Sequence, residues 1–111
     1  MALILFSEVR GTVLQHGQPV AHARVSREYR WSWKQHTGVD DTTTDAQGRF
    51  HFPAIEGRSL SARWLPHEPS VRQTITVEFA GRRHRVWAHH KANYRDHGEI
   101  GGPIVLTCAL D

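Results

Sequence analysis

Two turn signals constrain the fold of this chain more than any other feature. Gly17 to Pro19 mark the first turn, because glycine allows a positive φ angle and proline fixes its own. Asp45 and Gly48 bracket the second turn, in which the aspartate side chain can accept a hydrogen bond from the backbone two residues on. Gly11 lies inside the strand before the first turn, where glycine marks a bulge or a close backbone approach. These signals predict successive strands joined by tight turns.

Alternating apolar and polar side chains support the same interpretation. The clearest run is residues 21–34, in which every odd-numbered residue except Arg27 is apolar. These residues are Ala21, Ala23, Val25, Tyr29, Trp31 and Trp33. Alternation with a period of two buries one face of a strand and leaves the other in water. Further strands are predicted at 3–14 with a break near Ser7, and at 49–53, 60–64, 71–79, 83–88 and 104–110. An Ala80-Gly81 turn makes 71–79 and 83–88 a hairpin.

Two segments lack a strand pattern. Lys34 to Asp41 is predicted as a loop with Gly38 as a breaker, and His89 to Gly102 as a long loop or a short helical turn. The 111 residues match the size of one domain, so residues 1–111 are predicted to form a single antiparallel β-sandwich of seven or eight strands.

Composition excludes several classes of partner. The net charge is +3, but 11 acidic residues are interspersed among 14 basic ones, so no nucleic-acid partner is predicted. No apolar run approaches the length of a membrane span, and Met1 to Phe6 is too short for a signal peptide and is predicted as a first strand. The single cysteine, Cys108, fits a cytoplasmic location. Its parity with Ile104 and Leu106 predicts a buried, unreactive thiol.

No catalytic or metal-binding pattern is present. The chain has no Gly-x-Ser-x-Gly elbow, and a non-enzymatic protein without cofactor or metal is predicted. His84, His89, His90 and His97 lie close in sequence without a recognised zinc spacing, and adjacent histidines in a strand point to opposite faces. A metal protein built on this histidine cluster remains an alternative.

Aromatic side chains are the best candidates for binding. Trp31 and Trp33 either fill the core or form an exposed platform, and the sequence leaves both open. We predict another protein as the partner and a chain that is monomeric or weakly homo-oligomeric. The predicted partner-binding residues lie mainly in irregular segments: Trp33, His89, His90, Tyr94 and Arg95. The alternative is a carbohydrate-binding or structural module that uses Trp31, Trp33 and Trp64.

The strand-turn pattern of residues 8–52 resembles the carboxypeptidase regulatory-like domain, a member of the transthyretin-like (prealbumin-like) β-sandwiches. The resemblance implies a Greek-key sandwich of transthyretin-like or immunoglobulin-like topology. The chain ends Thr107-Cys108-Ala109-Leu110-Asp111 rather than in the Tyr-Arg-Gly-Ser of hydroxyisourate hydrolases, so that activity is not implied. Similarity to small stand-alone bacterial members implies an immunity or accessory role toward an effector of type VI secretion.

Overall fold

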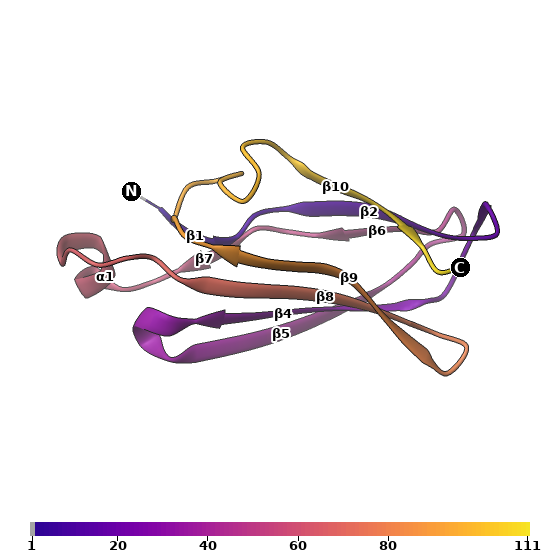
Figure 1. Ribbon diagram of the computed structural model, residues 1–111, viewed down its shortest axis with the longest axis horizontal. Helices are drawn as coiled ribbons and strands as arrows, with labels where there is room; N and C mark the ends of the chain where they lie inside the picture. The colour runs from indigo at the N-terminus through magenta and orange to yellow at the C-terminus, as the bar shows by residue number, and fades with distance from the viewer. Residues whose placement is uncertain (1) are drawn as a thin grey trace.

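The computed structural model describes residues 2–111, which form two facing four-stranded β-sheets around an apolar core and a further two-stranded sheet (Figure 1). The predicted all-β sandwich is confirmed, and residues 2–111 form ten strands where seven or eight were predicted. Met1, the first residue of the apolar run predicted as a strand, lies outside the described residues. The elements are β1 (Leu3–Phe6), β2 (Val9–Gln15), β3 (Gln18–Pro19), β4 (Arg24–Trp31), η1 (Ser32–Lys34), β5 (His36–Thr43), β6 (Arg49–Phe52), β7 (Ile55–Gly57), α1 (Leu60–Trp64), β8 (Val71–Phe79), β9 (Arg82–Lys91) and β10 (Ile104–Ala109).

The two main sheets have four strands each. One has the order β10-β2-β3, with β6 also paired to β2, and the other has the order β5-β4-β8-β9. All ladders are antiparallel except β10–β2, which is parallel from Ile104 opposite Val9 to Ala109 opposite Leu14. The parallel pair differs from the predicted antiparallel arrangement because the 92–103 segment carries the chain from β9 in one sheet to β10 in the other. No hairpin therefore sets the direction of β10.

The predicted turn at Asp45–Gly48 is confirmed. The turn predicted at Gly17 to Pro19 lies instead at His16–Gly17, because Gln18–Pro19 pair with β2 as strand β3. The Asp45 carboxylate Oδ1 accepts hydrogen bonds from the backbone N–H of Gln47 and of Arg49, each at 2.9 Å. Gly17 and Gly48 both have a φ of 75°. At Gly11 the close approach is the Phe50 ring, because a Cβ atom there would lie 2.2 Å from its Cζ.

The segment predicted as a loop at 34–41 is mostly strand. β4 ends at Trp31, the 3-10 helix η1 turns the chain, and β5 begins at His36. Gly38 does not break β5 but faces the Tyr29 ring, where a Cβ would lie 2.4 Å from Cε1. The Asp40 carboxylate is neutralised by Arg27, which stands directly opposite it on β4. The prediction was wrong because this cross-strand pairing is invisible in the local sequence.

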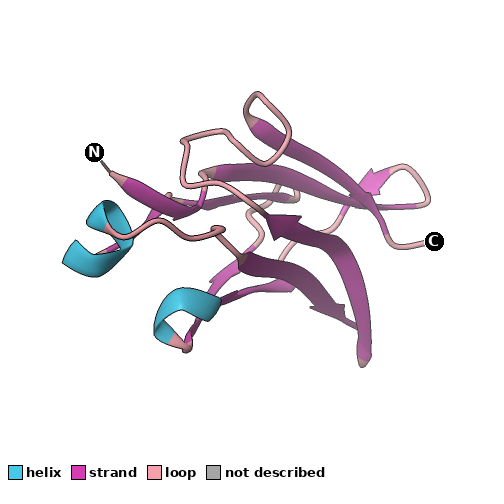
Figure 2. Cartoon of the chain, turned by 60° about the vertical axis from the view of Figure 1, so that its left-hand side comes forward, coloured by secondary structure: helices cyan, strands magenta, loops and turns pink. Residues whose placement is uncertain are grey.

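The run predicted as a strand at 60–64 is instead the helix α1. The Ser59 hydroxyl caps it by accepting a hydrogen bond from the Ala62 N–H at 3.1 Å. Ala62 packs into a second, smaller core cluster together with Leu3, Leu5, Trp31, Val71 and Tyr94. Neither helix formed by residues 2–111 is long and apolar enough to cross a membrane. Both short helices lie at the same end of the sandwich (Figure 2).

The buried position of Cys108 gives a prediction that tests the β10 register. Burial raises the pKa of its thiol from 9.0 to about 11. We expect a thiol reagent at neutral pH to modify the native protein at least about a hundredfold more slowly than the unfolded chain. Fast labelling of the native protein would show that β10 is placed with the opposite register.

The same pKa shift also predicts a pH dependence of stability. Between pH 9 and about 11 the folded thiol keeps its proton while the unfolded thiol has lost it. The contribution of Cys108 to stability is therefore fully present below pH 9 and is lost as the pH rises to about 11. A Cys108→Ala variant should lack this part of the decline in a series of urea melts.

Candidate functional site

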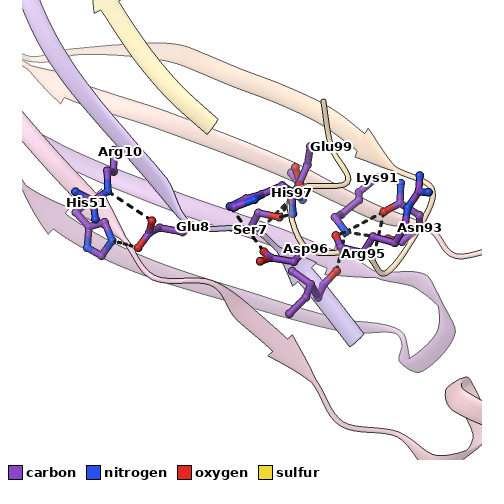
Figure 3. Close-up of polar contacts among 12 residues, drawn as sticks. Ser7, Glu8, Arg10, His51, Lys91, Asn93, Arg95, Asp96, His97 and Glu99 are labelled. Atoms are coloured by element: carbon purple, nitrogen blue, oxygen red, sulfur yellow. Dashed lines mark hydrogen bonds and ion pairs between the residues drawn. The ribbon is translucent and has the colours of Figure 1, made fainter. Parts of the chain in front are cut away.

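A buried lysine anchors the 92–103 segment, the longest irregular segment of the chain, to the end of the sandwich (Figure 3). The Lys91 ammonium donates to the backbone oxygens of Ile4, Asn93 and Arg95 and to Asn93 Oδ1, at distances of 2.5–3.2 Å. Burial lowers the pKa of Lys91, although Glu99 and Asp96 act in the opposite direction. These contacts fix the start of the segment against β1.

A buried carboxylate holds the other half of the same segment. Glu99 accepts hydrogen bonds from the Ser7 N–H at 2.8 Å, the Ser7 hydroxyl at 2.6 Å and Gln73 Nε2 at 2.8 Å. Burial raises the pKa of Glu99, but the hydrogen bonds from Ser7 and Gln73 outweigh it and hold the pKa below its ordinary value. The chain of contacts continues to the Trp87 indole, which donates to Gln73 Oε1 at 3.1 Å.

This network is built to support structure. Within the described residues, every buried side-chain nitrogen and oxygen has a hydrogen-bond partner. The Glu99 carboxylate already accepts three bonds, and the three N–H groups of the Lys91 ammonium are shared among four oxygens, so neither is poised to exchange a proton with a substrate. Its role is to hold 92–103 in one conformation.

Lys91→Met should lower the free energy of unfolding by about 2 kcal/mol. Four oxygens lose their donor, but the cost of burying an ammonium group disappears with it, so the loss is moderate. Chemical denaturation measures the loss, and limited proteolysis should show faster cleavage within 92–103. Lys34→Met is the matched control because Lys34, the only other lysine, is exposed. Equal behaviour of the two variants would contradict the anchoring role.

An aromatic hydrogen-bonded chain supports the end of the sandwich next to α1. The Trp31 indole N–H donates to the Tyr94 hydroxyl at 3.0 Å, and that hydroxyl lies 2.7 Å from His67 Nε2. His67 Nδ1 lies 2.9 Å from the Leu65 carbonyl, which only accepts, so Nδ1 carries a proton and donates it to this carbonyl. Trp33 stacks on His67 at 4.0 Å between ring centroids.

The structure brings some of the predicted partner-binding residues together and separates others. Trp33 and Tyr94 meet through His67, but Tyr94 is buried beneath the surface, where its pKa is raised by burial. His89 faces inward beside Trp87, whereas His90 lies on the outer sheet face, bonded to the Ser70 hydroxyl. The Arg95 side chain is exposed. The five residues therefore do not form one surface.

The open question about the tryptophans is settled by their burial. Trp31 is a core residue, and Trp33 is half-buried between His67 and the Ser61 hydroxyl, to which its indole N–H donates at 3.0 Å. Neither forms an exposed platform. The histidines are equally scattered, since residues 2–111 contain no group of three or more His, Cys, Asp or Glu side chains placed to hold a metal ion.

The two most exposed large apolar side chains of residues 2–111 belong to Trp64 and Leu60 of α1, and exposed Leu65 follows them at the C-cap. This cluster was not predicted from the sequence. Trp64 is 80% exposed, Leu60 75% and Leu65 54%. Leu60 and Trp64 stand four residues apart on the same side of the helix. We name these three residues the apolar tip. The missed signal was Ser59, an N-cap residue preceding good helix formers.

An apolar pocket of about 600 Å³ lies against the start of the 92–103 segment. Tyr94 lines this pocket, and its hydroxyl is connected through His67 to the Leu65 carbonyl of the apolar tip. The pocket is lined by Ala2, Ile4, Ala54, Pro69, Ala92, Asn93, Tyr94, Arg95 and Asp96. The anchored segment thus forms one wall of a concave apolar surface.

These features define a β-sandwich with an apolar end held by buried polar side chains. Residues 9–111 match the family model described as a domain of unknown function, DUF6795. The chain therefore belongs to the DUF6795 family. Comparison with the curated proteins and with the solved structures gave no match.

Proposed function

We propose that this protein is a non-enzymatic protein-binding module whose partner docks on the apolar tip. The observation that carries the proposal is the exposure of Trp64 at 80%, beside Leu60 at 75%. Clustered exposed apolar side chains mark interaction surfaces, and tryptophan is enriched among the residues that dominate binding energy. The pocket lined by Tyr94 offers room for an apolar side chain of the partner.

Rigid support of the apolar tip favours binding over accidental exposure. Ser59 caps the helix, Ala62 fixes it in the core, and Ser61 accepts a hydrogen bond from the Trp33 indole. His67 closes the following turn through its bonds to Leu65 and Tyr94. A surface that is already ordered loses little conformational entropy on binding.

The particular form of the proposal follows from the family resemblance in the sequence. The partner is a secreted bacterial effector, and the protein acts in the cytoplasm as its immunity or accessory protein. The single cysteine, buried and unpaired, fits that location. Such a role requires a tight complex of one copy of each chain.

A capture experiment tests the proposal. The immobilised chain is exposed at physiological salt to a lysate of the organism that encodes it. The parent should retain one protein in equal molar amount, and Leu60→Ser/Trp64→Ser should not retain it. Val105→Ser is the matched control, because Val105 is an apolar residue 70% exposed on β10. Retention of no protein, or equal retention by both variants, would contradict the proposal.

Carbohydrate binding is the second candidate because a solvent-exposed tryptophan ring can stack on a sugar. Of the three tryptophans expected to take part, Trp31 is buried and Trp33 is stacked on His67, so Trp64 alone is open. Titration with soluble glycans should change the tryptophan fluorescence of the parent but not of Trp64→Ser. The absence of any change up to millimolar sugar would remove this candidate.

A further inference from the structure

The outer face of the β5-β4-β8-β9 sheet carries a groove lined by arginines. Strand alternation sends Arg30 of β4, Arg72 of β8 and Arg85 of β9 to this face, away from the core. The groove has a volume of about 540 Å³. Its lining, which we name the arginine groove, consists of Glu28, Tyr29, Arg30, Arg72, Thr74, Thr76, Arg83 and Arg85.

The register of the sheet places like charges opposite one another. Arg30 of β4 stands directly across from Arg72 of β8. Like charges in directly opposed positions destabilise a sheet. Repulsion between Arg30 and Arg72 therefore lowers the stability of the isolated fold. An anion bound between the two guanidinium groups would remove this repulsion.

Ion pairs inside the chain neutralise only some of the arginines on this face. Arg24 pairs with Asp41 at 2.7 Å, and Arg83 with Glu78 at 3.3 Å. No ion pair from residues 2–111 reaches Arg30, Arg72 or Arg85. Glu28 is the one carboxylate that lines the groove, so apart from Arg83, which Glu78 neutralises, three lining arginines face one acidic group.

The spacing of the arginines indicates the chemistry of the ligand. Arg30 and Arg72 form one cationic end, and Arg85, in register with Thr76, belongs to the other. Four residues along a strand separate the two ends, which corresponds to about 13 Å. Guanidinium groups bind carboxylates through paired hydrogen bonds. Thr74 lines the groove between the two ends, and Thr76 lines it beside Arg85.

Nucleic acid fits this groove less well than an acidic peptide. Single-strand binding uses aromatic rings as stacking platforms, but Tyr29, the only aromatic residue in the lining, packs inward against the core. Glu28 would also repel a continuous phosphate backbone. A segment with carboxylates only at its ends avoids that repulsion.

We propose that the arginine groove binds an extended acidic segment with two carboxylate side chains four residues apart. The inference deepens the proposed function, on which it rests for the identity of the ligand as part of a partner protein. The acidic segment is a second contact, separate from the apolar tip.

Fluorescence anisotropy with a synthetic peptide tests the groove directly. The probe is a short fluorescein-labelled peptide with two glutamates separated by three Ser or Thr residues, at about 50 mM sodium chloride, where charge contacts are weakly screened. The same peptide with glutamines in place of glutamates is the control probe. The parent should bind the glutamate peptide and not the glutamine peptide.

Two double variants separate a site from a general charge effect. Arg30→Gln/Arg72→Gln should weaken binding at least about fivefold. Arg58→Gln/Arg95→Gln removes two exposed charges outside the groove and should bind like the parent. Equal weakening in both variants, or no binding of the glutamate peptide by the parent, would overturn the proposal. Tighter binding of an oligothymidine strand than of the peptide would assign the groove to nucleic acid instead.

The peptide-binding test of the arginine groove can fail or succeed independently of the capture test of the apolar tip. Leu60→Ser/Trp64→Ser leaves the arginine groove intact and should bind the glutamate peptide like the parent. Peptide binding with no captured partner would leave the groove standing and remove the docking role of the apolar tip. Capture of a partner through the apolar tip, without binding of the glutamate peptide, would support the docking role of the tip and overturn the proposal for the arginine groove.

Discussion

Arg27→Ala is expected to lower the free energy of unfolding by about 4 kcal/mol, the largest effect of any substitution considered. The Arg27 side chain is only 1% exposed, and its guanidinium lies between the Phe6 and Phe52 rings, 5.0 and 4.7 Å from their centroids. Its nitrogens donate to both Asp40 carboxylate oxygens at 3.0 and 2.7 Å and to the Pro53 carbonyl at 2.6 Å. Truncation removes all of these contacts and leaves a cavity.

Arg24→Ala is the matched control on the same strand. Arg24 also pairs with an aspartate of β5, Asp41, at 2.7 Å, but it does so in solvent. Exposed ion pairs contribute little, so its urea midpoint should stay close to that of the parent. Arg27→Lys should recover only part of the loss, because an ammonium group cannot donate to both oxygens of Asp40 in the same geometry. A similar midpoint for the Arg27 and Arg24 variants would show that the buried guanidinium adds nothing.

Gly48→Val is expected to cost about 3 kcal/mol, the second largest effect. The φ of Gly48 is 75°, a conformation that strains a β-branched residue. Its added Cβ would also lie 2.6 Å from the Val13 carbonyl oxygen and 3.0 Å from the Val20 nitrogen. Both atoms belong to the backbone of the β2–β3 hairpin, which cannot move without disrupting its hydrogen bonds.

Gly81→Val separates the two causes. Gly81 has a φ of 74° but no atom within 4 Å of its added Cβ. It should therefore show the backbone strain alone, about 1–2 kcal/mol. A Gly48 variant no less stable than the Gly81 variant would contradict the close contact with β2.

Local chemistry made much of the fold predictable. The Asp45–Gly48 turn, the Ala80-Gly81 hairpin and the inward parity of Cys108 depend on neighbours in sequence, and the structure confirms all three. Arg27 shows where this reasoning fails. Arg27 is a charged residue at an inward-facing position of the alternating run 21–34. Its burial could not be predicted locally, because its partners Asp40 and Pro53 come from β5 and from the chain after β6.

The candidate site was harder to predict for the same reason. Tyr94 was expected at the surface, but it is buried by contacts with Trp31 and His67, which lie 63 and 27 residues away. Trp64 was noticed only as one of three stacking candidates. Its exposure beside Leu60 follows from a helix that a five-residue alternating run does not distinguish from a strand.

Titration calorimetry with the captured partner tests the docking role of the apolar tip most directly. The parent should bind one partner per chain, and Val105→Ser should bind with the same affinity. Leu60→Ser/Trp64→Ser should bind at least about 30-fold more weakly, which corresponds to about 2 kcal/mol, while its melting temperature stays near that of the parent. Unchanged affinity in this double variant would contradict the claim that the partner docks on the apolar tip.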